Sequence, residues 1–180
     1  MDPVSERNAV LARLEHAVAL LTQSMSPELV PPAGAQVGYA IRGARDKNGI
    51  AAVEDRISGP AGAMKTGGPC LFGTDEEIAR VILTVMRFDP RRRCAALLRY
   101  SDRALKVLDE SLFLEAVSFD ATKAPPGIST MDWGVASCCK EEVPDVIYSR
   151  GSRDTGAVLI LLGEDPAGVA NNIIICSNRI

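Results

Sequence analysis

The stretch TDEEIARVILTVMRFDPRRRCAALLRY, residues 74–100, decides the fold class because it predicts a helix, a break and a buried strand in direct succession. Apolar residues recur at helical spacing in its first half, which predicts a helix over residues 75–87. Thr74 followed three residues later by Glu77 is the pattern of a capping box at the start of that helix. After the break, an unbroken apolar run predicts a buried strand over residues 94–100.

The rest of the chain continues this alternation of helices and strands. An apolar stripe at i, i+4, i+7 and i+11 spacing, beginning at Val10, predicts an amphipathic helix over residues 5–24. Further strands are predicted at 36–42, 51–58, 62–66, 115–120, 145–149 and 157–162, and further helices from about residue 102, over 132–141 and over 166–177. This alternation favours a sheet covered by helices. We expect a single domain over residues 1–180, of which the N-terminal helix and linker, residues 1–28, form a part.

The composition is that of a folded protein that binds neither nucleic acid nor membrane. Hydrophobic residues make up 47% of the 180 residues and charged residues 24%, which is typical of globular chains. A net charge of -3 disfavours a partner whose phosphates must be followed by a basic surface. The chain lacks an apolar run near the ~20 residues that span a bilayer, and its N-terminus lacks a signal-peptide pattern. We therefore expect a cytoplasmic protein.

The cysteines and the histidine predict no metal site. The five cysteines are odd in number, show no C-x-x-C spacing and mostly lie in apolar runs, so we interpret them as buried thiols. Cys138 and Cys139 are adjacent in the sequence, and they are the only two cysteines for which we consider a role beyond packing. A single histidine, His16, offers too few ligands for zinc.

Five segments resemble, in order and spacing, signature stretches of the thiamine-phosphate synthase family abbreviated ThiN. They are VGYAIRGARDKNGIAAVEDRI, FGTDEEIARVILTVMRFDP, CAALLRYS, the WG at 133–134 and VPDVIYSRG. The resemblance runs from about residue 29 to 165. It implies an α/β fold, a three-layer α/β/α domain with a mixed, mostly antiparallel sheet, similar to the class II aldolase-like fold. Family members are commonly fused to a pyrimidine kinase or to a helix-turn-helix, and we expect neither here.

The resemblance also implies a reaction. The family joins hydroxymethylpyrimidine diphosphate to thiazole phosphate, so that diphosphate leaves as the thiazole nitrogen attacks. Such a site must place cationic donors where negative charge develops, and arginine suits this because its planar fork binds phosphate oxygens in pairs. The position of Arg56 resembles that of the family's catalytic arginine. The residues that would bind the ligand or its phosphate are Gln36, Gly73, Arg80, Arg99, Arg150 and Gly151.

Ion pairing and the start of a helix both bear on which of these residues would bind a phosphate. For each arginine the ordinary alternative is an ion pair at the surface or between elements. Small residues before the helix at 75–87 would leave backbone N–H groups free for an anion at Gly73 and Thr74. The run Arg91, Arg92 and Arg93 follows a proline, and we interpret it as a solvated turn.

Several departures from the family pattern predict that catalysis is weakened. Glu77 stands where the family has a catalytic histidine, and an ionised carboxylate cannot donate to a departing diphosphate. We interpret Glu77 instead as the second half of the capping box. Further polar or cationic family residues are replaced at Pro32, Gln36, Leu97, Ser149 and 154–157.

These observations lead to one preferred hypothesis and two alternatives. The preferred hypothesis is a thiamine-phosphate synthase-like domain that binds thiamine phosphate, a phosphorylated precursor or another phosphorylated small molecule, with weak or lost catalysis. The first alternative is an active synthase in which Arg56 carries most of the charge stabilisation and Mg²⁺ assists the diphosphate. The second is a ligand-sensing or interaction module whose first helix pairs with a partner, or with a second copy as a homodimer, through the stripe that includes Leu14 and Leu21.

Overall fold

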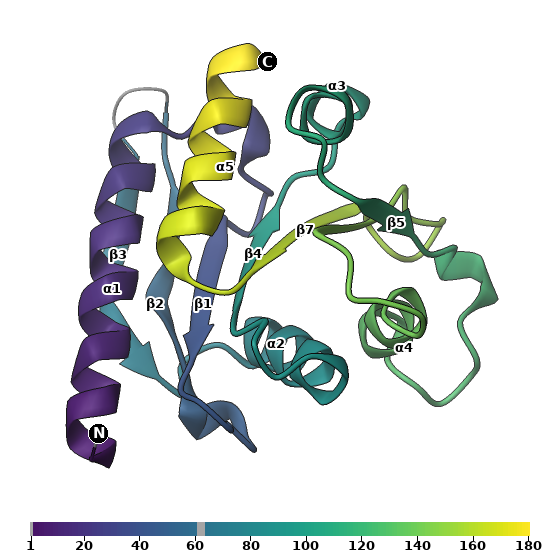
Figure 1. The fold of residues 1–180 in the computed structure, drawn as a ribbon. Helices are drawn as coiled ribbons and strands as arrows, with labels where there is room; N and C mark the ends of the chain where they lie inside the picture. The colour runs from purple at the N-terminus through teal and green to yellow at the C-terminus, as the bar shows by residue number, and fades with distance from the viewer. Residues whose placement is uncertain (1, 61–63) are drawn as a thin grey trace.

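The computed structural model describes residues 2–60 and 64–180 and contains a seven-stranded sheet with helices on both faces (Figure 1). The strand order is β3-β2-β1-β4-β7-β6-β5. Neighbouring strands are antiparallel except β5 and β6, which are parallel. The sheet is therefore mixed and mostly antiparallel, which confirms the fold expected from the resemblance.

The elements follow the predicted order. The strands are β1 Gln36–Ala40, β2 Ile50–Ser58, β3 Lys65–Phe72, β4 Cys94–Leu98, β5 Ala116–Ser118, β6 Val146–Ser149 and β7 Val158–Gly163. The helices are α1 Pro3–Ser24, α2 Glu76–Phe88, α3 Asp102–Lys106, α4 Thr130–Cys138 and α5 Pro166–Arg179. Short helical turns are η1 Pro27–Leu29, η2 Lys47–Gly49, η3 Val107–Ser111 and η4 Ala121–Lys123.

Strand β3 is the element whose bounds differ most from the prediction. We predicted a strand at 62–66, of which residues 62 and 63 lie outside the described residues, whereas β3 runs from Lys65 to Phe72. Pro69 and the glycines of this segment favour a loop in any pattern analysis. They are tolerated because β3 lies at the edge of the sheet, where a missing N–H need not break a pairing on both sides.

Helices cover the two faces of the sheet in pairs, as Figure 1 shows: α1 and α5 pack on one face, and α2 and α4 on the other. Strands β1 and β4 lie in the middle of the sheet and are buried along their whole length. This burial explains why the segment at 94–98 shows an unbroken apolar run instead of alternation.

The apolar stripe of α1 packs inside the chain's own core. Val10, Leu14, Ala17 and Leu21 are all buried there. The hypothesis that this stripe pairs with a partner is therefore wrong, because the sheet already covers it. Among the described residues, neither α1 nor any other helix is both long enough and apolar enough to cross a membrane.

All five cysteines are buried and free, as predicted. Burial raises the pKa of the Cys70 thiol to about 11, as it does for Cys176. The adjacent thiols of Cys138 and Cys139 behave in the same way, because burial raises the pKa of each to about 11. These thiols pack as small apolar groups.

Gly38 lets α2 pack directly on the backbone of β1. A Cβ atom at this position would lie 2.8 Å from Ile78 Cγ1 and 2.9 Å from Ile82 Cδ1. Both isoleucines are fully buried, so neither has room to move away. This close approach sets the distance between α2 and the sheet, and with it the position of the first turn of α2.

We predict that Gly38→Val lowers the free energy of unfolding by about 2 kcal/mol, because the added side chain overpacks the contact between α2 and β1. Gly156→Val is the matched control, since a Cβ at Gly156 meets nothing within 4 Å. It should change stability by less than about 0.5 kcal/mol. Urea unfolding followed by circular dichroism measures both, and equal effects of the two substitutions would contradict the packing described for Gly38.

Candidate functional site

Arg56 lies near the end of β2, where the pairing with β3 becomes irregular. The register between β2 and β3 shifts on both sides of Asp55. Such irregularities locally re-aim side chains. The backbone next to Arg56 is fixed by two reciprocal hydrogen bonds, because Ala35 and Ile57 donate to each other's carbonyl oxygens at 2.8 Å. Arg56 thus projects from a well-held strand end toward the start of α2.

The guanidinium of Arg56 is bound by two carboxylates. Its Nε donates to Asp75 Oδ2 at 3.0 Å and its Nη2 to Asp75 Oδ1 at 3.3 Å, which is a two-pronged pair. Nη2 also donates to Glu77 Oε1 at 3.0 Å. Because the side chains of Arg56 and Asp75 are 21% and 11% exposed, this pair is shielded from solvent more than an ordinary surface pair.

Gln36 holds Asp75 from the other side. Its Nε2 donates to Asp75 Oδ2 and to the carbonyl of Val53, both at 3.0 Å. Its Oε1 accepts from the backbone N–H groups of Val37 and Val53. Gln36 is fully buried, and its amide donors and acceptor are occupied by protein. In this structure it therefore supports Asp75 and presents no group to a ligand.

Asp75 is also the N-cap of α2, which corrects the predicted capping box by one residue. Its side chain accepts a hydrogen bond from the N–H of Ile78, three residues on. Thr74 is not the cap, and Glu77 does not complete a box but binds Arg56. The choice between two adjacent residues that both cap helices well is decided here by the tertiary partner, Arg56.

The cluster of Arg56, Asp75 and Glu77 carries one positive and two negative charges. Burial raises the pKa of the Asp75 carboxyl, but the hydrogen bonds from Arg56, Gln36 and the N–H of Ile78 outweigh that effect. The pKa of Asp75 is therefore lowered below its ordinary value of 3.8. One guanidinium and two carboxylates give the cluster a formal net charge of about -1.

A cavity of about 230 Å³ opens beside this cluster. Arg56 and Glu77 supply its charged groups. Its other walls are apolar or small, formed by Pro31, Pro32, Ala33, Leu97, Leu98, Met131, Ala157, Val158 and Leu159. The cavity therefore combines an apolar interior with a partly neutralised charged edge. It lies where β4 ends and β7 begins.

The four predicted arginines do not converge on this cavity, because only Arg56 among them lines it. Arg80 is paired with Asp132, which links α2 to α4. Arg150 lies over the rings of Tyr148 and Tyr100, with its Cζ 5.5 Å and 5.8 Å from the ring centres. The structure thus keeps Arg56 at the site and places Arg80 and Arg150 in contacts elsewhere.

The remaining predicted residues have backbone roles in this structure. Arg99 follows β4 with an exposed side chain, and its N–H donates to the carbonyl of Leu29 at 2.8 Å. Gly73 has a φ of +76° and donates to the Ile50 carbonyl at 3.1 Å, so it turns the chain from β3 toward α2. Gly151, with a φ of +82°, turns the chain after β6. The anion expected at Gly73 has a built-in substitute, because the Asp75 carboxylate occupies the N-terminus of α2.

The run of three arginines is not merely a solvated turn. Arg91 is exposed and pairs with Asp89, as expected of such a turn. Arg92, however, reaches Asp145 at 3.2 Å, and Arg93 donates from Nε to the carbonyl of Ala40 at 3.0 Å. Both side chains are partly buried, so two of the three have structural contacts that the charge run alone did not indicate.

Asp75 is the site residue that sequence reasoning missed. The signal in the sequence is Asp75 itself, which stands directly before the helix and is a residue type that caps helices well. Across residues 2–60 and 64–180, no three His, Cys, Asp or Glu side chains are grouped so that they could hold a metal ion. The charged groups at this site are Arg56 and the two carboxylates, Asp75 and Glu77.

Comparison of the sequence with known proteins identifies one family. The family model described as thiamine-phosphate synthase ThiN matches residues 13–175. The bifunctional thiamine biosynthesis protein ThiDN of Methanocaldococcus jannaschii is 30% identical over 170 residues, which are 93% of this chain and 40% of that protein. The chain thus spans less than half the length of this curated relative.

Solved structures agree with the fold. The crystal structure of the C-terminal domain of protein MJ0236 matches with a TM-score of 0.87 and 29% identity, over 96% of this chain and 95% of that one. The C-terminal domain of phosphomethylpyrimidine kinase matches with a TM-score of 0.88 and 26% identity, over 95% of this chain and 100% of that one. A likeness of fold alone extends to L-fuculose-1-phosphate aldolase from Thermus thermophilus, with a TM-score of 0.54 and 12% identity over 96% and 92% of the two chains.

We predict that Asp75 stabilises the fold in a pH-dependent way. Because its pKa is lowered in the folded state, its contribution is complete above its ordinary value of 3.8 and is lost as the pH falls toward the folded pKa. Asp75→Asn keeps the shape of the side chain but removes the charge. Its free energy of unfolding should therefore fall less steeply than that of the wild type between about pH 4 and pH 2.

The control for this prediction is Asp165, which caps α5 by accepting from the N–H of Gly168 at 2.8 Å. Among the described residues it forms no ion pair with an arginine. Asp165→Ala should cost about 1 kcal/mol, the usual value of a cap. Asp75→Ala should cost about 2–4 kcal/mol, since it also leaves Arg56 and Gln36 without their acceptor. Equal costs for the two substitutions would show that the contacts of Asp75 beyond the cap add nothing.

Proposed function

This chain belongs to the thiamine-phosphate synthase ThiN family, and on that premise we propose that it binds thiamine phosphate in the cavity beside Arg56, with weak or absent synthase activity. One relative is a bifunctional thiamine biosynthesis protein, of which this chain matches 40%. The observation that carries the proposal is the double pairing of Arg56 with Asp75 and Glu77 at the edge of an apolar cavity.

The walls of the cavity suit a flat ring. Nine of the eleven residues that line it are proline, alanine, leucine, methionine or valine. Ligand pockets are usually apolar, with a few polar groups that fix orientation, and the pyrimidine and thiazole rings of thiamine are bodies of this kind. At about 230 Å³ the cavity accommodates one ring with its substituents and leaves the phosphate at its mouth.

The charge at the edge of the cavity favours thiamine phosphate over the diphosphate precursor. Joining the two precursors through the thiazole nitrogen gives that nitrogen a fixed positive charge. A cluster with a net charge of about -1 attracts this cation. It repels the diphosphate of hydroxymethylpyrimidine diphosphate more than the monophosphate of thiamine phosphate, because the diphosphate carries more negative charge and its molecule has no fixed cation. Glu77, whose side chain is 50% exposed, is the carboxylate that a ligand in the cavity reaches directly.

The same pairing argues against efficient catalysis. A departing diphosphate is stabilised by donors that are already in place and not occupied by other anions. The Arg56 guanidinium instead donates its Nε and Nη2 hydrogen bonds to Asp75 and Glu77. Releasing it would require a carboxylate in a partly buried site to lose its partner, which is costly. If Mg²⁺ assists the diphosphate, Asp75 and Glu77 are the carboxylates beside the cavity, and Mg²⁺ would add the positive charge that the site lacks.

We predict that the protein binds thiamine phosphate more tightly than hydroxymethylpyrimidine diphosphate, as measured by isothermal titration calorimetry. Glu77→Gln should weaken the binding of thiamine phosphate about three- to fivefold, because it removes one exposed negative charge near the thiazolium. The same substitution should improve the binding of the diphosphate precursor, since the cluster becomes neutral.

The matched control is Glu76→Gln, which removes the same charge one residue earlier. Glu76 pairs with Lys47 at 3.3 Å and does not line the cavity. Its substitution should leave the affinity for thiamine phosphate unchanged. Absence of binding at millimolar thiamine phosphate, or equal losses in the two variants, would contradict the proposed ligand and its position.

We further predict that Glu77→His raises the synthase rate with both precursors at least about tenfold. An imidazole at this position supplies a donor toward the diphosphate and releases Arg56 from its second carboxylate, and a positioned acid or base typically contributes 10²–10⁴-fold. A coupled assay of thiamine phosphate formation measures the rate. If the wild-type protein already turns over as fast as Glu77→His, the histidine is dispensable and the chain is a working synthase.

A further inference from the structure

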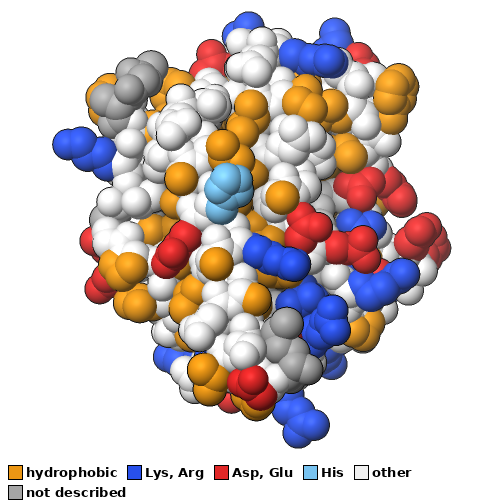
Figure 2. All heavy atoms as spheres, turned by 60° about the vertical axis from the view of Figure 1, so that its left-hand side comes forward, with side chains coloured by type: hydrophobic (Ala, Val, Ile, Leu, Met, Phe, Trp, Pro, Cys, Tyr) orange, Lys and Arg blue, Asp and Glu red, His pale blue; other side chains and the backbone are white. Residues whose placement is uncertain are grey.

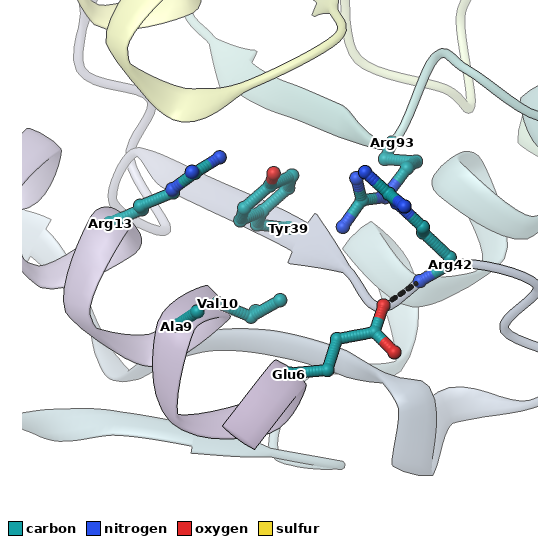
Figure 3. Close-up of a pocket in the computed structure, with 7 residues that line it drawn as sticks. All are labelled: Glu6, Ala9, Val10, Arg13, Tyr39, Arg42 and Arg93. Carbon is teal, nitrogen blue, oxygen red and sulfur yellow. Dashed lines mark hydrogen bonds between the residues drawn. The ribbon is translucent and has the colours of Figure 1, made fainter. Parts of the chain in front are cut away.

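A second cavity of about 240 Å³ lies at the opposite end of the central strands, between α1 and the sheet (Figure 3). It is lined by Glu6, Ala9, Val10, Arg13, Tyr39, Arg42 and Arg93. Strand β4 separates the two cavities, since Arg93 directly precedes it and Leu98 is its last residue. At about 3.3 Å per residue, that strand places them roughly 13 Å apart or more.

Three arginines reach this cavity from three separate elements. Arg13 projects from α1, Arg42 from the turn after β1, and Arg93 from the residue before β4 (Figure 3). Within residues 2–60 and 64–180, none of the three forms an ion pair of 4.0 Å or less with a carboxylate. This contrasts with Arg56 at the first cavity, whose guanidinium is shared by two carboxylates.

The one carboxylate that lines the cavity neutralises little of this charge. Glu6 accepts from the backbone N–H of Arg42 at 2.7 Å, so its contact is with the main chain and not with a guanidinium. Three arginines against one glutamate leave the lining with a net charge of about +2. Two further acidic groups line adjoining hollows: Glu164 together with Arg42 and Arg93, and Asp165 together with Arg13. Neither forms an ion pair with these arginines among the described residues.

Tyr39 provides a buried polar group that points into the cavity. Its side chain is only 2% exposed, and its hydroxyl makes no hydrogen bond to the described part of the protein. The hydroxyl is nevertheless not sealed off, because the described residues include no buried polar side-chain atom without a partner. In Figure 3 it lies between the guanidinium of Arg13 on one side and those of Arg42 and Arg93 on the other.

Two contacts fix the orientation of the Arg93 guanidinium at the cavity. Its Nε donates to the carbonyl of Ala40 at 3.0 Å, and its Cζ lies 4.8 Å from the centre of the Tyr39 ring. These two contacts fix the plane of the group and leave its terminal nitrogens without an acceptor among the described residues. Arg13 and Arg42 are exposed and can close on a bound group from either side.

We propose that this cavity, defined by Arg13, Tyr39, Arg42 and Arg93, is a binding site for the phosphate group of a small phosphorylated molecule. Arginine forks bind phosphate oxygens in pairs, and a tyrosine hydroxyl donates a further hydrogen bond to an oxyanion. The volume is below the roughly 300–1,000 Å³ of pockets for drug-sized ligands, so it fits a phosphate with a small organic body. Figure 2 shows Lys and Arg side chains gathered on the lower part of one face, beside a group of Asp and Glu side chains.

The site is distinct from the cavity proposed to bind thiamine phosphate. The first cavity lies on the face covered by α2 and α4, and its charged groups sum to a negative charge. The second lies under α1 and is positively charged. A phosphate probe should therefore perturb the second cavity and not the first.

Isothermal titration calorimetry at low ionic strength tests the proposal with inorganic phosphate, pyrophosphate, glycerol 3-phosphate and acetate, because screening weakens such contacts beyond a Debye length of about 10 Å at 0.1 M salt. We expect the phosphate probes to bind and acetate to bind at least tenfold more weakly. Tighter binding of glycerol 3-phosphate than of inorganic phosphate would support a ligand with an organic body, and the reverse order would overturn that part. Equal binding of acetate and phosphate would overturn the assignment to phosphate.

Variants locate the binding. The double variant Arg13→Ala/Arg42→Ala should lose at least tenfold in affinity for the best phosphate probe. Tyr39→Phe should lose about threefold while its thermal unfolding stays unchanged. The control Arg87→Ala/Arg179→Ala removes the same charge from exposed positions outside the cavity and should bind like the wild type. An equal loss in both double variants would reduce the effect to general charge and overturn the site.

Amide chemical shifts of the wild-type protein provide a readout that does not depend on any variant. Titration with the best phosphate probe should move signals of residues 9–13, 39–42 and 93. Shifts concentrated instead at residues 56 and 75–77, or no binding of any phosphate probe at millimolar concentration, would contradict the proposal. Either result leaves the thiamine phosphate cavity to be judged by its own titrations.

Discussion

The carboxylate of Asp75 is the interaction on which the architecture of the site depends. It caps α2, pairs with Arg56 at the end of β2 and accepts from the buried amide of Gln36 in β1. Three elements that are distant in sequence thus meet on one charged group. Because α2 packs against the bare backbone at Gly38, the first turn of the helix has little freedom to move away. The position of Arg56 and the electrostatic character of the neighbouring cavity both follow from this junction.

Much of the fold could be predicted from the sequence because its signals are local. The helical period of α2 indicates that one face of the helix is buried, and the unbroken apolar run of β4 indicates that both faces of the strand are buried. Both elements were predicted close to their observed bounds. Strand β3 was misplaced, because Pro69 favours a loop unless one knows that the strand lies at an edge. The mixed, mostly antiparallel character of the sheet came from the family resemblance. The strand order was not predicted, since antiparallel pairing of distant segments leaves no local pattern.

The site was less predictable for a physical reason. An arginine is a candidate phosphate ligand only if it is not already paired with a carboxylate. The carboxylates that pair with it come from other elements, which the local sequence does not reveal. Arg56 is held by the start of α2, and Arg80 by α4. Conversely, Arg93 was expected in a solvated turn, yet it lies beside Tyr39 in a cavity. None of the three arginines that line this cavity pairs with a carboxylate in the part of the chain that the structure describes. The sequence therefore shows which residues are cations but not which of them pair with a carboxylate.

The two cavities have opposite electrostatic character. The cavity beside Arg56 has apolar walls and a negative edge, whereas the cavity under α1 is positive. We propose that the first cavity receives a cationic ring while Arg56 remains bound to Asp75. A crystal structure with thiamine phosphate would decide this. We expect the thiazolium ring beside Glu77, with the pair of Arg56 and Asp75 intact. A phosphate bound to an Arg56 that has left Asp75 would contradict it.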